Sequence, residues 1–346
     1  MASTIKEVAK LAGVSIGTVS RAFNGYSDIR PQTRLRIEAA ARELGYVPNI
    51  SARNLSSKQP PNIGLIVSGL LEGNRKDAGS YLLLQGVFGY ASEHGLQVAL
   101  YLTDAVEQRK RSFLQFCAQH SLSGAIVSGI TKDDVYLQEL ANSSIPSVGI
   151  DFEISGDSSG WVSVDNRLAA RQMAEYLFGL GHEEIVIIAG KRNAMVNEER
   201  LLGVREAYEA AGRRLSQRRV VYADFSEEKA REKTRDLLAL PSGHKITAWL
   251  CFSDLMAIGV IDALKIAGVQ VPGEATVTGF DDLPIAQFVA PPLTTVFQDM
   301  RLLGYEGAAL LHRMMRFEQK GGHQLVSHKL IRRGSSAARA SLSKSE

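Results

Sequence analysis

The chain has 346 residues, of which 45% are hydrophobic and 22% are charged. This length exceeds what one hydrophobic core usually organises, so we expect two or three domains, and the composition excludes a largely disordered chain. Cys117 and Cys251 stand in unrelated segments, which favours two buried thiols over a disulfide or a metal site. No apolar run approaches the roughly 18 residues of a membrane span, and the N-terminus lacks the apolar region of a signal peptide. We therefore expect a cytoplasmic protein without a membrane partner.

The net charge of +3 is distributed unevenly along the chain. Residues 1–60 contain nine Lys and Arg against four Asp and Glu, which leaves +5, whereas residues 61–346 contain 31 against 33, which leaves −2. A basic N-terminal head on a near-neutral body indicates a polyanion as the partner of the head alone.

Residues 3–24 are predicted to form two short helices joined by a tight turn. Thr4 and Glu7 have the spacing of a capping box, in which the hydroxyl binds the N3 amide and the carboxylate binds the N–H of the cap. The helix that follows carries one apolar stripe, formed by Ile5, Val8, Ala9 and Ala12. Gly13 supplies the turn, and Ser15 is the expected N-cap of the second helix. Two short helices joined by a glycine-containing turn are a helix-turn-helix.

A third helix is predicted over residues 31–44, with Pro31 at its first position and Gly45 just beyond its end. Its inner stripe consists of Ile37, Ala40, Ala41 and Leu44. The segment 49–55 has weak helical character but is too short to hold a helix alone, because isolated helices need about 12–15 residues. We expect it to be coil until a partner orders it. Residues 56–61 form a short linker that closes the head.

From residue 63 onwards, short apolar strands alternate with helices. In the first series, strands are expected at 63–67, 96–102, 124–128 and 147–150, with helices near 81–94, 107–120 and 133–142. In the second series, strands are expected at 161–164, 184–189, 220–222, 248–252 and 275–279, with helices near 166–180, 197–212, 226–239 and 254–267. This alternation predicts an α/β core of two lobes, each a doubly wound parallel sheet. Ligands of such sheets bind beyond the carboxyl ends of the strands, so we expect a site between the lobes.

Several polar or aromatic side chains follow the predicted strands and are candidates to line that cleft: Asp151, Phe225, Ser253, Asp254, Asp281 and Asp282. For Asp254 and Asp282, capping of the next helix is an equal alternative. Asp151 and Asp281 stand at the strand tips and are the better candidates. Arg200 has the chemistry to clamp a pair of hydroxyls or a carboxylate, although a surface position would explain it equally.

These residues together resemble a LacI/GalR-type bacterial transcription regulator over almost the whole chain. In the head the resemblance rests on residues 4–9, 12–15, 18–21, 24, 44–46, 48–49 and 52–53. In the core it rests on residues 63–65, Leu-Gly-His at 180–182, Gly-Phe-Asp-Asp at 279–282, and 292–299. An ordered set of motifs is far more specific than a lone helix-turn-helix. The expected architecture is an all-α helix-turn-helix head on a two-lobed core like that of periplasmic binding proteins.

The resemblance implies a homodimer whose two heads each bind half of a pseudo-palindromic operator in double-stranded DNA. Ile16, Gly17 and Arg21 fall where the family reads bases; Arg21 would contact guanine and Ile16 a thymine methyl, whereas Gly17 has no side chain to read with. The phosphate and positioning contacts would be Thr4, Ser15, Thr18, Ser20 and Asn24.

The resemblance also assigns residues 49–56 as a hinge helix that orders on DNA, which explains the weak helical segment noted above. Its DNA-binding positions are Asn49, Ala52, Arg53 and Leu55, with Leu55 as the wedge in the minor groove. The implied domains are a head over 1–60 and a core over 61–340. Lobe 1 would comprise about 61–162 and 293–324, and lobe 2 about 163–292 and 325–340.

A small effector in the cleft would control whether the hinge helices form, and its class is expected to be a sugar or a nucleoside. The family's effector-contact positions are occupied here by Tyr81, Asp151, Arg200, Phe225, Asp281 and Gln298, and Ser253 stands where Asn is common. The sequence departs from the family pattern at two places: the loop over 71–80 is longer, and Arg30 replaces the usual hydroxyl cap before Pro31. The polar tail has no leucine heptad, so we expect a dimer rather than a tetramer.

Two other classes of protein compete with this interpretation. A periplasmic-type sugar-binding protein would fit the core, but the DNA-binding head and the missing signal peptide argue against it. An enzyme is disfavoured because no catalytic triad order, phosphate loop or zinc spacing is present. We expect no enzymatic activity and no cofactor other than a small-molecule effector.

Overall fold

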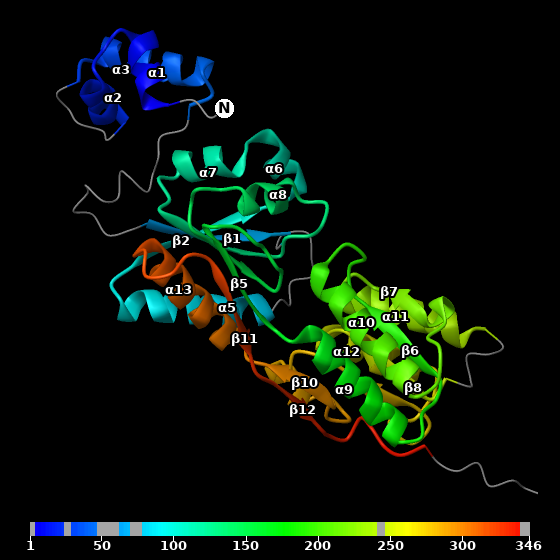
Figure 1. Cartoon of the computed structure of the whole chain (residues 1–346). Helices are drawn as coiled ribbons and strands as arrows, with labels where there is room; N and C mark the ends of the chain where they lie inside the picture. Colours follow the sequence, from blue (N-terminus) through cyan, green and yellow to red (C-terminus); the bar gives the residue numbers. More distant parts are fainter. Residues whose placement is uncertain (1–3, 24–28, 47–61, 70–77, 241–245, 340–346) are drawn as a thin grey trace, which may run out of the picture.

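The structure is a computed structural model of the chain that describes residues 4–23, 29–46, 62–69, 78–240 and 246–339. Its first three helices are α1 (Ile5–Ala12), α2 (Ile16–Phe23) and α3 (Pro31–Glu43), which enclose a small core of their own (Figure 1). Val8, Val19 and Ile37 are fully buried at its centre. The predicted capping box is confirmed, because the Glu7 amide donates to the Thr4 hydroxyl and the Thr4 amide donates to Glu7 at 2.6 Å.

The first lobe is built on a six-stranded parallel sheet in the order β11-β5-β4-β3-β1-β2. Its strands are β1 (Asn62–Ser68), β2 (Gln97–Thr103), β3 (Gly124–Ser128), β4 (Ser147–Ile150), β5 (Ser159–Val164) and β11 (Gly322–Val326). Helices α6 (Ala105–Lys110), α7 (Phe113–Gln119) and α8 (Val135–Ala141) cover one face, and α5 (Ala78–Glu93) and α13 (Met300–Met315) cover the other (Figure 1).

The second lobe has a four-stranded parallel sheet in the order β7-β6-β8-β9. Its strands are β6 (Ile185–Ala189), β7 (Val220–Tyr222), β8 (Ala248–Cys251) and β9 (Thr276–Thr278). Helix α9 (Asn166–Gly179) packs against α10 (Met195–Ala210), and α11 (Glu227–Leu238) packs against α12 (Asp254–Ile266). The short 3₁₀ helices η1 (Gln217–Arg219) and η3 (Pro284–Gln287) complete it.

The chain passes between the lobes after β5, after β10 (Thr295–Gln298) and after β11. β10 pairs antiparallel with β12 (His328–Ile331) in a separate two-stranded sheet. Single bridges join Thr278 to Thr294 and Asp281 to Phe297, so β10 is also attached to the end of β9. The residues after β10 therefore lead directly from the second lobe into α13 of the first.

Two sequence-based expectations for the core are wrong. The strand expected at 161–164 as the start of the second series is β5, which lies in the first sheet between β4 and β11. An apolar strand buried on both faces reveals its length but not its partners. The single helix expected over 107–120 is two helices, because Ser112 caps a new one: its hydroxyl accepts from Gln115, whose side chain accepts from the Ser112 amide.

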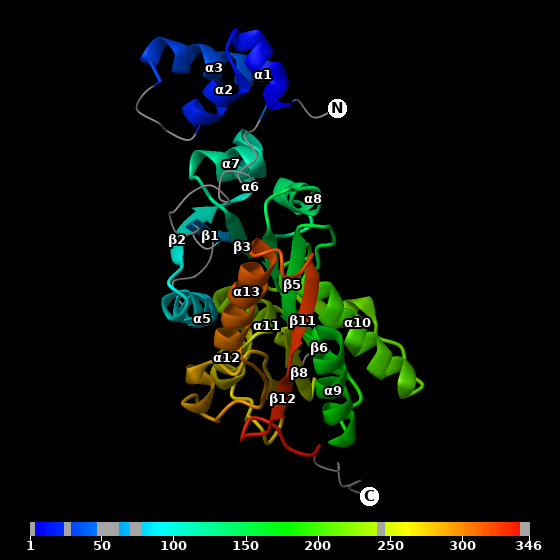
Figure 2. The same cartoon turned by 60° about the vertical axis from the view of Figure 1, so that its left-hand side comes forward.

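Helices α5 and α13 lie side by side (Figure 2). Two glycines, Gly86 and Gly304, stand where their backbones come closest. A Cβ atom on Gly86 would lie 1.9 Å from the Arg301 carbonyl oxygen, and one on Gly304 would lie 2.2 Å from that of Leu83. Because these neighbours are backbone atoms, no side-chain movement would make room for them. The two helices are thus packed backbone against backbone.

Candidate DNA-binding and effector sites

Helix α2 presents a mostly polar outer face, because its apolar residues Val19 and Ala22 point into the head. Ile16 is 44% exposed on that face, and Gly17 and Arg21 are also exposed. The three predicted base-reading positions therefore lie on one accessible surface. An apolar side chain, an open backbone and a guanidinium are suited to the floor of a major groove.

Hydroxyls fix the start of this helix. The Thr18 amide donates to the Ser15 Oγ at 3.1 Å, and the two hydroxyl oxygens are 2.9 Å apart, so Ser15 is the N-cap as predicted. The other end of α2 is held by Arg34, whose Nη1 donates to the Ala22 carbonyl at 2.8 Å. Thr4 is engaged in the capping box, and its two hydrogen bonds lower the pKa of Glu7. The remaining predicted DNA contacts, Asn24, Asn49, Ala52, Arg53 and Leu55, lie outside the described residues.

Left-handed backbone conformations mark the carboxyl ends of the core strands. Five residues other than glycine have positive φ there: Asp151 (61°), Asp224 (53°), Phe225 (58°), Asp281 (119°) and Asp282 (54°). They follow β4, β7 and β9, so both lobes contribute. Such conformations are unfavourable for L-residues and often occur at functional sites. The predicted strand-end residues Asp151, Phe225 and Asp281 are all among them.

Arg200 is the centre of a polar network that joins the lobes. It lies on α10, is only 3% exposed, and donates from Nε to Asn166 at 2.8 Å and from Nη1 to the Phe252 carbonyl at 2.5 Å. Asn166 donates to the Ser163 Oγ at 3.1 Å, and Ser163 in turn donates to Asp151 at 2.8 Å. The chain of contacts thus runs from α10 of the second lobe to the ends of β4 and β5 in the first.

Buried charge shapes this network. Burial raises the pKa of Asp151, against the opposing effects of Arg200 and of the Ser163 hydrogen bond. Burial likewise lowers the pKa of Arg200, which Asp281, Asp151 and Asp254 counteract. One guanidinium therefore serves three carboxylates, which makes their ionisation interdependent.

Asp281, which follows β9, and Gln298, at the end of β10, meet through their side chains. The Gln298 Nε2 donates to Asp281 at 2.6 Å, and the Asp281 amide donates to the Val296 carbonyl at 2.8 Å. Gln298 is 4% exposed, and its Oε1 is buried without a hydrogen-bond partner among the described residues. Buried polar atoms in proteins nearly always have a partner, so this oxygen is a candidate acceptor for a bound hydroxyl group.

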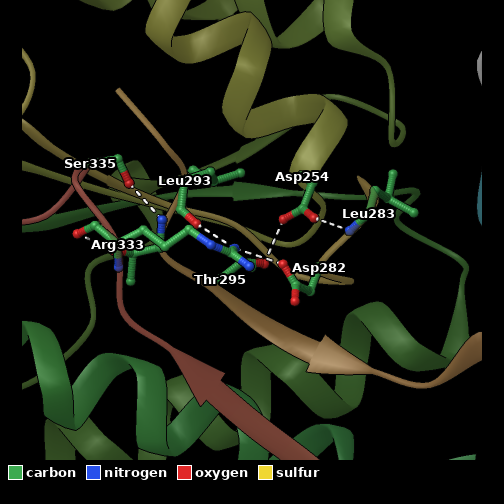
Figure 3. Close-up of polar contacts among 8 residues, drawn as sticks. Asp254, Asp282, Leu283, Leu293, Thr295, Arg333 and Ser335 are labelled. Atoms are coloured by element: carbon green, nitrogen blue, oxygen red, sulfur yellow. Dashed lines mark hydrogen bonds and ion pairs between the residues drawn. The ribbon is translucent and has the colours of Figure 1, made fainter. Parts of the chain in front are cut away.

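Asp254 and Asp282 hold the loop that carries Asp281 (Figure 3). Asp254 accepts from the Leu283 amide at 2.7 Å and from the Thr295 hydroxyl at 2.5 Å, and Asp282 pairs with Arg333 at 2.6 Å. The alternative that these two carboxylates cap the following helices is therefore wrong. Ser253 is the cap of α12, since its hydroxyl accepts from the Met256 amide at 3.2 Å.

A cavity of about 420 Å³ lies where the lobes meet. Of the predicted effector residues, only Asp151 lines this cavity. Its lining also includes residues that were not predicted as effector contacts, among them Lys132, Trp161, Met195, Glu198 and Leu325. Arg200 stands behind this lining, and Tyr81 is 61% exposed at the start of α5. The ring of Phe225 covers Gly190, where an added Cβ would lie 2.0 Å from it. Trp161 reaches the cavity because β5 pairs with β4 and β11, and its local sequence does not encode these partners.

Comparisons with known proteins decide the family. Residues 4–49 match the description "Bacterial regulatory proteins, lacI family", and residues 174–336 match "Periplasmic binding protein-like domain". The chain is 34% identical over 313 residues to the transcriptional regulator CelR of Thermobifida fusca, which covers 89% of this chain and 90% of CelR. The chain belongs to the LacI family.

Other relatives support the same conclusion. The repressor CytR of Escherichia coli is 31% identical over 97% of both chains. Among solved structures, the complex of CelR with cellobiose has a TM-score of 0.74 at 30% identity and covers 96% of this chain and 100% of CelR. A Lac repressor dimer bound to operator and the anti-inducer ONPF has a TM-score of 0.70 at 27% identity and covers 98% and 100%.

This LacI-family chain is a DNA-binding transcription regulator, and its fold is the predicted helix-turn-helix head on a two-lobed α/β core. Within the described residues, no helix is long and apolar enough to cross a membrane. In the same part of the chain, no group of three or more side chains has the arrangement of a metal site. The relatives named above are regulators of transcription rather than enzymes.

Proposed function

We propose that this protein is a repressor that binds a pseudo-palindromic operator as a dimer and responds to a carbohydrate in its interlobe cleft. The observation that carries the proposal is the polar network from Asp151 to Arg200 beside the 420 Å³ cavity. It links the ligand-facing ends of both sheets, so a bound molecule would contact the two lobes at once. Because its partner is chromosomal DNA, we expect the protein to act in the cytoplasm.

The chemistry of the cleft suits a small polyhydroxylated ligand. Sites for such ligands combine an apolar surface with a few well-placed polar groups, in a volume of about 300–1,000 Å³. Trp161 and Leu325 supply apolar surface, and Asp151 supplies a carboxylate. Gln298 does not line this cavity, but its buried Oε1 is an acceptor without a partner among the described residues. CelR, which this chain resembles, has been solved with cellobiose bound. Asp281 and Arg200 would then position these groups.

The dimer would form through apolar surfaces on both lobes. On the first lobe, Tyr81 and Phe88 are seven residues apart on α5 and are 61% and 41% exposed, and Leu100 and Leu102 of the edge strand β2 are each 41% exposed. On the second lobe, Ile285 and Phe288 are 43% and 83% exposed. Large apolar side chains with this much exposure are candidates for a protein interface. A two-fold axis would then set the spacing of the two heads on DNA.

The DNA part of the proposal is tested by selecting operators from random duplexes with the full chain. We expect inverted repeats, with binding that weakens steeply as salt rises because the basic head displaces counterions. Arg21→Ala should lose preference at one base pair per half-site by about 1–3 kcal/mol. An equal loss on all sequences would show that Arg21 contacts phosphate instead. Residues 49–56, proposed as the hinge helix, should gain amide protection on operator binding.

The effector part is tested by thermal shift of the full chain with neutral sugars, including cellobiose, and with nucleosides as the competing class. We expect a sugar to raise Tm and to change operator affinity, and Asp281→Asn to abolish both responses while it leaves operator binding intact. A response to nucleosides alone would overturn the carbohydrate assignment. No response to either the sugars or the nucleosides would overturn the proposed effector site in the cleft.

A further inference from the structure

Two loops on opposite lobes contact each other at the side of the cavity. Asn193 of the second lobe donates from Nδ2 to Asp133 at 2.6 Å and to the Thr131 hydroxyl at 3.3 Å, and its carbonyl accepts from the Lys132 amide at 3.0 Å. Lys132 also forms an ion pair with Glu198 at the start of α10. We call these five residues the interlobe latch: Thr131, Lys132, Asp133, Asn193 and Glu198.

Both halves of the latch are shaped by hydrogen bonds within their own lobes. On the first lobe, the buried Asp134 accepts from the Thr131 amide at 2.6 Å and from its hydroxyl at 2.7 Å. On the second lobe, Asn197 accepts from the Gly190 amide at 2.6 Å, which fixes the turn before Asn193. The two loops therefore meet in a preset shape, so that closing the lobes costs little loop ordering.

The latch is separate from the effector-facing network but borders the same cavity. Lys132 and Glu198 line the cavity, and so does Met195, which packs against the apolar core of the first lobe. None of the five latch residues belongs to the segments that connect the lobes, which lie after β5, β10 and β11. Its contacts are thus non-covalent and can break when the lobes separate.

We propose that the interlobe latch holds the lobes together in the absence of effector and so sets how much of the protein is competent to bind one. The Lys132–Glu198 pair is about half exposed on both sides and contributes weakly by itself. The hydrogen bonds of Asn193 contribute more to lobe closure, because each hydrogen bond lost changes an equilibrium constant by about 2- to 10-fold. Only the link to effector affinity rests on the proposed function; the closing contact itself does not.

The test measures the distance between the lobes without any ligand. Spin labels are placed at the exposed positions Gln138 on α8 and Arg205 on α10, each substituted by Cys in the full chain, and distance distributions are recorded by pulsed electron paramagnetic resonance. The native Cys117 and Cys251 are buried and should stay unlabelled. We expect a short distance to dominate in the parent chain, and Asn193→Ala to shift the ratio of short to long distances by about 2- to 10-fold.

Charge reversal supplies a second, independent measurement. Lys132→Glu and Glu198→Lys should each raise the long-distance population, and the double variant should restore the parent distribution. Lys233→Ala, which removes the exposed ion pairs of Lys233 with Glu232 and Asp236 within α11, is the matched control and should change nothing. Distributions that are the same in the parent chain, in Asn193→Ala and in both charge reversals would overturn the proposal, whatever the effector proves to be.

Discussion

The guanidinium of Arg200 lies over the ring of Phe280, with its central carbon 3.5 Å from the ring centroid. The same guanidinium donates hydrogen bonds to Asn166 and to the Phe252 carbonyl, so it joins the ends of β8 and β9 to the start of α9. A planar cation suits this place because it stacks through its face and donates through its edge. Arg200 thus supports the cleft from behind.

Substitution of Arg200 should therefore affect stability as well as the response to effector. Arg200→Met keeps much of the apolar stem but leaves Asn166 and the Phe252 carbonyl without their donor, which we expect to cost about 3 kcal/mol in the free energy of unfolding. Urea denaturation would measure the loss. Arg200→Lys should recover only part of it, because an ammonium cannot stack on Phe280 while it donates to both acceptors; full recovery would refute the stacking role.

Ionisation of the buried Asp254 carboxyl should lower the free energy of unfolding as pH rises. Burial raises the pKa of Asp254, and the nearby Asp281 raises it further, so the folded protein holds this proton more tightly than the unfolded chain does. Stability is then greatest below the unfolded pKa of 3.8 and is lost as pH rises through the folded pKa. Asp254→Asn should remove that loss, so the variant should gain stability relative to the parent chain as pH rises from 4 to 8.

The comparison with Asp254→Asn needs denaturation curves of both chains at several pH values. The asparagine can still accept from Leu283 and donate to the Thr295 oxygen, so the loop should keep its shape. A difference between the chains that does not vary with pH would contradict the assigned charge effect.

Gly17→Ala should stabilise the head. A Cβ at Gly17 would meet only the Ser15 Oγ at 3.7 Å, and alanine favours a helix over glycine by up to about 1 kcal/mol. Gly13→Ala is the contrasting variant, since Gly13 has open space but a φ of 63°, which alanine adopts only with strain. Thermal unfolding of the head should move in opposite directions for the two; a parallel change would show that backbone conformation does not decide the outcome.

Phe288→Glu should weaken the proposed dimer. This side chain is 83% exposed, and a charge placed at the centre of an apolar contact is expected to cost about 2 kcal/mol or more in association. Sedimentation velocity over a range of concentrations would measure the change. Phe317→Glu is a suitable control, because Phe317 is similarly exposed at 68% but lies outside the two apolar surfaces. Unchanged dimerisation of Phe288→Glu would place the interface elsewhere.

Local features of this chain could be predicted from sequence, whereas features set by strand partners could not. The capping box of Thr4 and Glu7 depends on side chains three residues apart, and the structure has it as predicted. The place of β5 depends on contacts with β4 and β11, which lies about 160 residues later, and no local pattern encodes it. The break between α6 and α7 is a local feature that the sequence does display, since Ser112 and Gln115 form a second capping box.

The effector positions show the same division. Residues at strand tips were found because parallel strands end at one edge, and Asp151 and Asp281 are there. That Arg200 would be buried under Asn166 and Phe280 depends on the packing of α9 against α10, which the sequence does not display. Trp161 and Lys132 come to the cavity through β5 and the loop after β3, so their roles appear only once the sheet is assembled.

The glycine contacts between α5 and α13 connect two regions of the first lobe. Gly86 and Gly304 bring the two backbones so close that neither position has room for a side chain. Helix α13 follows β10, which is bridged to Asp281, and helix α5 bears the exposed side chains of Tyr81 and Phe88. Under the proposed function, effector binding and dimerisation would therefore both depend on this pair of helices, and Gly86→Ala or Gly304→Ala should disturb both.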